Sequence, residues 1–124
     1  MRLLFAIGVA GFFGAISRYL VGGWVYRLTP GAFPYGTLCV NVLGSLLLGI
    51  VFQLGTDRAV LSPELRVALA TGFMGAFTTF STFSLETVNL LREGSLVLAL
   101  ANIGGNVLLC VVAAWLGMGL VRLL

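Results

Sequence analysis

The sequence predicts an all-α membrane protein with four transmembrane helices, the third of them broken. Three observations lead to this prediction. The chain has 124 residues, of which 60% are hydrophobic and only 9% are charged, and a soluble domain of that size needs more polar surface to stay wetted. Its uncharged runs are long enough for the roughly 20 residues that a bilayer-spanning helix needs. One of these runs also contains a cluster of small and hydroxyl-bearing residues, which is typical of a helix break.

The placing of the charged residues defines the four spans. No Asp, Glu, Lys or Arg occurs in three runs, residues 28–56, 67–85 and 94–121. Residues 3–26 form a fourth apolar run if the single Arg18 is tolerated inside it. We therefore expect one transmembrane domain, residues 1–124, with short connections between spans at about 3–26, 35–55, 65–91 and 95–122.

The first span carries Arg18 about one turn from its end. An Arg in the middle of a membrane helix costs roughly 2.5–3.5 kcal/mol on insertion scales, and less where its side chain reaches the interface. Arg18 therefore either anchors the helix at the interface or gives an anion a positively charged approach.

Buried amides are expected in the second and fourth spans. Asn41 lies inside an apolar run, and Asn102 and Asn106 lie one turn apart on one face of the last helix. A buried amide without a partner costs about 1–3 kcal/mol. Each of these side chains should therefore bond to another helix or to a solute.

The third span contains T-T-F-S-T-F-S at residues 78–84, with Gly72 and Gly75 before it. Thr and Ser compete with the backbone for hydrogen bonds, so we expect the helix to break between Gly75 and Thr79. Irregular backbone at membrane depth is tolerated only inside protein or along a wet cavity, and its freed carbonyls can coordinate a cation.

Two faces follow that break. Phe80 and Phe83 share one face, and the other carries hydroxyls together with one carboxylate, from Thr79, Ser81, Thr82, Ser84 and Glu86. Hydroxyls, amides and the edges of phenyl rings can all meet a small anion. The alternative is that the hydroxyls bond back to preceding carbonyls while the rings face lipid. The density of hydroxyl groups favours a lined pathway.

The charge balance gives almost no orientation signal, although cytoplasmic loops normally carry the excess of basic residues. All seven basic residues are Arg. The face with both termini should hold Arg2, Arg58, Arg66 and Arg122, and the opposite face Arg27 and Arg92, with Arg18 if it reaches that side. The protein could thus insert both ways up and form antiparallel pairs, or a weak bias could be decided during insertion.

These motifs resemble the Fluc family of fluoride channels, also called CrcB proteins. The matching segments are G-A-I-S-R-Y at 14–19, G-T-L-C-V-N-V-L-G-S at 36–45 and G-A-F-T-T-F-S-T-F-S-L-E at 75–86. The resemblance covers essentially the whole chain. It implies a channel of the bacterial inner membrane with four spans, assembled as an antiparallel dual-topology homodimer. Such a dimer has two fluoride pores and a structural sodium ion at its centre.

The resemblance also implies roles for particular residues. Phe80 and Phe83 would supply the ring edges, Asn41 would donate its amide to fluoride, and a polar track would comprise Thr79, Ser81 and Thr82. The backbone carbonyls of Gly75 and Thr78 from both subunits would hold the sodium ion, and Arg18 and Glu86 would lie near the pore entrances. The family often has Tyr and then Ser where this chain has Asn102 and Asn106, which can still donate hydrogen bonds along the pathway.

The implied function is passive export of cytoplasmic fluoride, which confers resistance to it. A negative-inside potential drives an anion outward by about 2.3 kcal/mol per charge per 100 mV. The closest alternative is a small proton-coupled multidrug-type exporter, whose first helix carries a membrane-embedded Glu. This first span has no carboxylate. A non-transporting assembly subunit is a third reading. No enzyme is expected without His or paired carboxylates, and no nucleic acid is expected as a partner.

Overall fold

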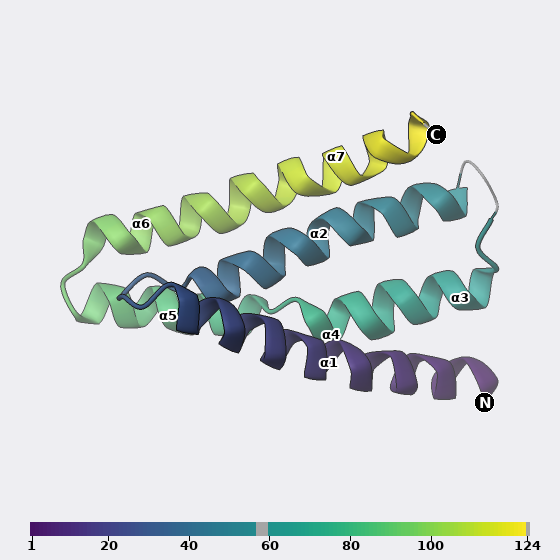
Figure 1. Cartoon of the computed structure of the whole chain (residues 1–124), viewed down its shortest axis with the longest axis horizontal. Helices are drawn as coiled ribbons and strands as arrows, with labels where there is room; N and C mark the ends of the chain where they lie inside the picture. Colours follow the sequence, from purple (N-terminus) through teal and green to yellow (C-terminus); the bar gives the residue numbers. More distant parts are fainter. Residues whose placement is uncertain (57–59, 124) are drawn as a thin grey trace.

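The computed structural model describes residues 1–56 and 60–123, and these form helices joined by short connections (Figure 1). The first two long helices are α1 (Arg2–Leu28) and α2 (Tyr35–Thr56). The third crossing is built from α3 (Pro63–Val67), η1 (Ala68–Met74), α4 (Gly75–Phe77) and α5 (Phe80–Arg92). The fourth consists of α6 (Leu96–Gly104), η2 (Gly105–Leu109) and α7 (Cys110–Arg122).

Within the described residues, three helical stretches are long and apolar enough to span a bilayer: Arg2–Leu28, Tyr35–Thr56 and Leu96–Arg122. The third crossing is not among them because it is divided between α4 and α5. An all-helical, multi-pass membrane protein with a broken third helix is therefore confirmed.

The break lies at Thr78 and Thr79, at the downstream end of the predicted region. Thr78 has φ −85° and ψ 161°, and Thr79 has φ −151° and ψ 109°, so both residues are extended. Gly75 remains helical, with φ −61° and ψ −33°. The π-helical segments η1 and η2 were not predicted from the sequence, since a π-turn leaves no simple periodicity in the hydrophobic pattern.

Close backbone contacts hold the long helices together. The backbone of α2 meets that of α7 at Gly49 and Gly117, where an added Cβ would collide with a carbonyl of the facing helix. In the same way, Gly14 of α1 lies against the backbone of Phe73 in η1. Small residues at such positions let membrane helices approach closely, since apolar side chains gain little by leaving lipid.

The start of α1, the end of α2, the start of α3 and the end of α7 lie at one end of the bundle, and the α1–α2 and α5–α6 connections lie at the other (Figure 1). Arginines accordingly occupy both ends, with Arg2, Arg66 and Arg122 at the first and Arg27 and Arg92 at the second. Arg58, which was also predicted at the first end, lies outside the described residues. The weak charge bias expected from the sequence therefore holds for the arginines that are described.

Candidate functional site

Asn41 of α2 holds the helix break together. Its side-chain Oδ1 accepts a hydrogen bond from the Thr79 backbone N–H at 2.8 Å, and its Nδ2 donates to the Thr79 carbonyl at 3.2 Å. The side-chain amide thus pairs with Thr79 as a second peptide group would. Because extended backbone at membrane depth loses its helical partners, this pairing satisfies groups that would otherwise be costly to bury.

Thr79 also starts the helix that follows the break. Its side-chain Oγ1 accepts from the Thr82 backbone N–H at 3.1 Å, so Thr79 is the N-cap of α5. The Thr79 hydroxyl donates to Thr82 Oγ1 at 2.8 Å and lies 3.4 Å from Ser81 Oγ. Three of the predicted track hydroxyls therefore gather at the first turn of α5.

The alternative reading, that hydroxyls bond back to carbonyls of the preceding turn, is right for part of the cluster. Thr78 donates to the Met74 carbonyl at 3.0 Å, and Ser84 donates to the Phe80 carbonyl at 2.8 Å. The Thr79 hydroxyl does not do so. Back-bonding therefore accounts for the hydroxyls at either end of the cluster. The hydroxyls at the start of α5 instead bond to one another and cap the helix.

The break changes the hydrogen bonding of two carbonyls. In a continuous α-helix, the N–H of Thr79 would donate to the Gly75 carbonyl and that of Thr82 to the Thr78 carbonyl. Here the Thr79 N–H donates to Asn41 and the Thr82 N–H donates to the Thr79 side chain. The carbonyls of Gly75 and Thr78 have thus lost their helical donors, and Gly75 is exposed on the surface of the chain.

A chain of amides continues from Asn41 into the fourth crossing. Asn41 donates to Asn106 Oδ1 at 2.8 Å, and Asn106 donates to the Oδ1 of Asn102 at 2.9 Å and to its backbone carbonyl at 3.1 Å. Asn102 in turn donates to Thr87 Oγ1 at 2.9 Å. The predicted buried amides therefore satisfy one another, and they connect α2, α5, α6 and η2.

A cavity of about 320 Å³, here called the narrow cavity, lies on one side of the break. Its lining combines Asn41, Thr79 and Asn106 with apolar side chains, including Phe80 and Phe83. The two ring centroids are 5.3 Å apart with 57° between the ring planes. Phe83 is buried, whereas Phe80 is 77% exposed on the protomer.

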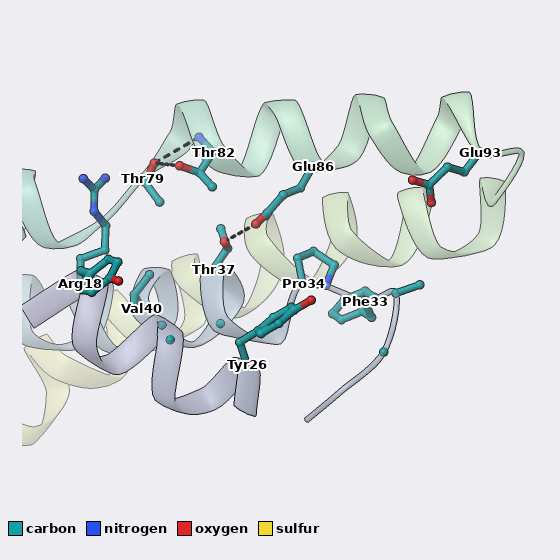
Figure 2. A pocket seen from close by; sticks show the side chains of 16 residues that line it. Arg18, Tyr26, Phe33, Pro34, Thr37, Val40, Thr79, Thr82, Glu86 and Glu93 are labelled. Carbon is teal, nitrogen blue, oxygen red and sulfur yellow. Dashed lines mark hydrogen bonds between the residues drawn. The ribbon is translucent and has the colours of Figure 1, made fainter. Parts of the chain in front are cut away.

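A second cavity of about 600 Å³, the wide cavity, also reaches the break (Figure 2). Arg18 of α1, Thr37 of α2 and Thr82 and Glu86 of α5 line it. Thr79 lines both cavities. The wide cavity therefore brings the predicted entrance residues to the polar start of α5.

Glu86 is fixed in the wide cavity by Thr37. Its Oε1 accepts from the Thr37 hydroxyl at 2.7 Å (Figure 2). Its other oxygen, Oε2, is buried and has no hydrogen-bond partner among residues 1–56 and 60–123. Glu86 is therefore a partly satisfied acidic group facing the same cavity as Arg18.

The structure thus brings most of the predicted site residues together. The exceptions are Ser81 and Gly75, which are exposed and line neither cavity, and Asn102, which is fully buried behind Asn106. Sequence reasoning missed Thr37 and Thr87. Thr37 lies four residues before Asn41 and Thr87 four residues after Phe83, so helical spacing from the residues already chosen would have found both.

The chain matches the family described as "CrcB-like protein, Camphor Resistance (CrcB)" over residues 5–118. It is 54% identical to a protein of Syntrophotalea carbinolica over 98% of both chains. It is also 52% identical to one of Sulfurovum sp. over 97% of this chain and 94% of the relative, and 44% identical to one of Geotalea daltonii over 98% of both chains.

Each of these relatives is named "Fluoride-specific ion channel FluC". They are ion channels and not enzymes, which confirms the expectation that this chain is not a catalyst. The match covers all four helical crossings and includes the break with the side chains that surround it. The chain therefore belongs to the CrcB family.

Proposed function

We propose that this protein is a fluoride channel that lets fluoride leave the cytoplasm passively and so confers fluoride resistance. The relatives at 44–54% identity are named as fluoride-specific channels. The observation that carries the proposal is the juxtaposition at the break, where Thr79 lines both cavities and Asn41 and Phe83 line the narrow cavity beside it. A small anion passing there gives up water and needs donors to replace it.

The proposed path runs from the wide cavity past Thr79 into the narrow cavity. Arg18 supplies positive charge on the wide side, and Thr82 and Ser81 offer hydroxyls near the start of α5. Beyond Thr79, the path meets the side chains of Asn41 and Asn106, with Phe80 and Phe83 supplying positively polarised ring edges. Glu86 lies at the entrance. Its negative charge repels a hydrated anion that does not bind close to Arg18.

Asn41 would contact fluoride by giving up its weaker internal bond. Both of its N–H groups are used within the protomer, one on the Thr79 carbonyl at 3.2 Å and the other on Asn106 at 2.8 Å. The longer bond is the easier one to exchange for an anion, because charged acceptors bind an N–H about twice as strongly as neutral ones.

The protomer supports assembly as an antiparallel homodimer. Phe80 is 77% exposed beside the narrow cavity, where Val107 and Val111 are also exposed. A second copy packed there would cover these apolar groups and enclose the path. Since arginines lie at both ends of the bundle, either insertion direction is acceptable. Two copies related by a twofold axis would have two equivalent fluoride paths.

The carbonyls of Gly75 and Thr78 fit a structural sodium ion. Both have lost the donors that a continuous helix would supply. Carbonyl oxygens are the ligands that discontinuous membrane helices commonly offer to sodium. Two copies meeting at their breaks would present four such oxygens, and the ion would tie the breaks together without taking part in permeation. The proposed location is the inner membrane of a bacterium.

The decisive experiment is efflux from liposomes that hold the purified protein, followed with a fluoride electrode. The fluoride gradient is applied at equal pH on both sides, with valinomycin and potassium to dissipate the membrane potential. Rapid fluoride release and negligible chloride release support the proposal. Absence of fluoride release would favour the non-transporting subunit instead.

The same liposomes distinguish a channel from a proton-coupled exporter. An exporter needs a titrating group at membrane depth, and Glu86 of α5, which lines the wide cavity together with Glu93, is the carboxylate bonded to Thr37 there. If fluoride moved only when a pH gradient was applied, the passive pore would be wrong. We expect the rate to follow the fluoride gradient alone.

A further inference from the structure

Asn41, Asn106 and Asn102 form a row of hydrogen-bonded amides, and the groups at the two ends of this row determine the orientation of each amide. This matters because the oxygen and nitrogen of an Asn side chain have the same shape but opposite hydrogen-bonding character. An anion pathway requires that N–H groups, and not oxygens, are held where the ion passes. The hydrogen bonds of the described residues show which neighbours fix the oxygen and nitrogen positions of each amide.

The first end lies at Thr87. Its hydroxyl donates to the Phe83 carbonyl at 2.8 Å, and a carbonyl can only accept. Thr87 Oγ1 therefore has only lone pairs left, and it accepts from Asn102 Nδ2 at 2.9 Å. The oxygen side of the Asn102 amide must then face Asn106, where it accepts at 2.9 Å.

The second end lies at Thr79. Its backbone N–H can only donate, so it fixes Asn41 with the oxygen toward the break and the nitrogen toward Asn106. The Thr87 end imposes the same orientation. Because Asn102 turns its oxygen toward the Asn106 nitrogen, the Asn106 Oδ1 faces Asn41. If Asn106 were reversed, two NH₂ groups would face each other, and one would lose its acceptor.

We propose that Thr87 and Asn102 are positioning residues that hold Asn106 with its Oδ1 toward Asn41, and so keep the Asn41 N–H groups in the orientation that fluoride passage requires. The inference rests on the proposed function and deepens it. Asn102 is fully buried, and neither residue lines the wide or the narrow cavity. Both therefore act through Asn106. This assigns a role to Thr87, and it makes Asn102 a support for the pathway and not a contact of the ion.

The test replaces the Thr87 hydroxyl while keeping the shape of the side chain. Thr87→Val removes the acceptor for Asn102, and Thr87→Ser keeps it. Thr56→Val is the matched control, because the Thr56 hydroxyl also donates to the carbonyl four residues earlier but lies at the end of α2, away from the amides. We expect Thr87→Val to lower the fluoride-to-chloride flux ratio roughly fivefold, since one net hydrogen bond is worth about 1 kcal/mol and 1.4 kcal/mol is tenfold. Thr87→Ser and Thr56→Val should keep the wild-type ratio.

A second measurement does not depend on transport. In ¹H–¹⁵N spectra of the protein in detergent, the side-chain N–H signals of Asn106 should exchange with water far more slowly than those of Asn89, which is exposed. Thr87→Val should accelerate that exchange although Thr87 does not touch Asn106, and Thr87→Ser should not. A purely structural role for Thr87 predicts lower stability without this selective change.

The outcomes separate this inference from the proposed function. If the wild-type protein passes no fluoride, the proposed function fails, while the exchange measurement still tests the amide orientation. If the wild type passes fluoride and Thr87→Val matches it in flux ratio and in Asn106 exchange, the positioning role is overturned. Should Thr87→Val not fold, the wild-type spectrum decides, and Asn106 exchange as fast as that of Asn89 overturns the inference.

Discussion

Phe80 and Phe83 show how one motif places similar residues in different surroundings. Their side chains lie three positions apart with ring centroids 5.3 Å from each other, yet Phe83 is 7% exposed and Phe80 is 77% exposed. Phe83 therefore belongs to the packing of the protomer as well as to the narrow cavity. Phe80 can be replaced with little effect on the fold of the protomer, which makes it the better probe of the pathway.

We expect Phe80→Ile to lower fluoride efflux from liposomes roughly tenfold, because an aromatic edge contact is worth about 0.5–1.5 kcal/mol and Ile has no polarised edge. Phe12→Ile is the control, since Phe12 lies on α1 and is also well exposed, at 62%. Undiminished fluoride flux through Phe80→Ile would remove the ring edges from the mechanism.

Thr79 also stabilises the fold through its side chain. As the N-cap of α5 it accepts from the Thr82 N–H. Loss of an N-cap costs about 1 kcal/mol. Thr79→Ala should therefore lower the melting temperature of the purified protein, and Thr79→Ser, which keeps the accepting oxygen, should largely restore it. Equal melting temperatures for the two variants would show that the cap contributes nothing.

At the scale of the elements, the broken third crossing was predictable in kind but not in full detail. The Thr and Ser cluster indicated a break between Gly75 and Thr79, and the structure has it at Thr78–Thr79. The position depends on Asn41, which is 38 residues away from Thr79 in the sequence and binds its backbone. A local pattern carries no information about a partner at that distance, and for the same reason the Thr37–Glu86 pair was missed.

Gly44 of α2 fits the break to the second helix. A Cβ added there would collide with Thr78 Cγ2 and lie 3.1 Å from a ring carbon of Phe77. Gly44→Ala should therefore destabilise the protein by about 1–3 kcal/mol through overpacking. Gly8→Ala is the matched control, because an added Cβ meets no neighbouring atom within 4 Å there. Thermal unfolding of both variants in detergent checks this, and equal loss of stability would argue against a tight contact at Gly44.

At the scale of the whole molecule, the proposed sodium site links the break to assembly. The carbonyls of Gly75 and Thr78 lack their helical donors, and a cation shared by two copies would compensate for them. We expect replacement of sodium by N-methylglucamine to lower the melting temperature of the purified assembly and to shift it toward smaller species in light scattering. An assembly indifferent to sodium would remove the ion from the account.

The wider picture is a small membrane protein in which a break in one helix is held by an amide from another, and we propose that this break provides the ion path. The membrane class, the four helical segments and most of the residues that gather at the break could be predicted from composition and from the three motifs. The amide chain through Asn102 and Thr87 could not, because each single Asn was compatible with either a helix contact or an ion contact. Only the distances among them show that they bond to one another.

We propose that fluoride crosses the protein at the break held by Asn41. Fluoride efflux from liposomes with Asn41→Ala, compared with wild type and with the exposed-site control Asn89→Ala, tests it most directly. Asn41→Ala removes three hydrogen bonds around Thr79 and Asn106, so we predict more than about a tenfold loss of fluoride flux, with Asn89→Ala unchanged. Wild-type fluoride flux through a correctly assembled Asn41→Ala protein would contradict the account.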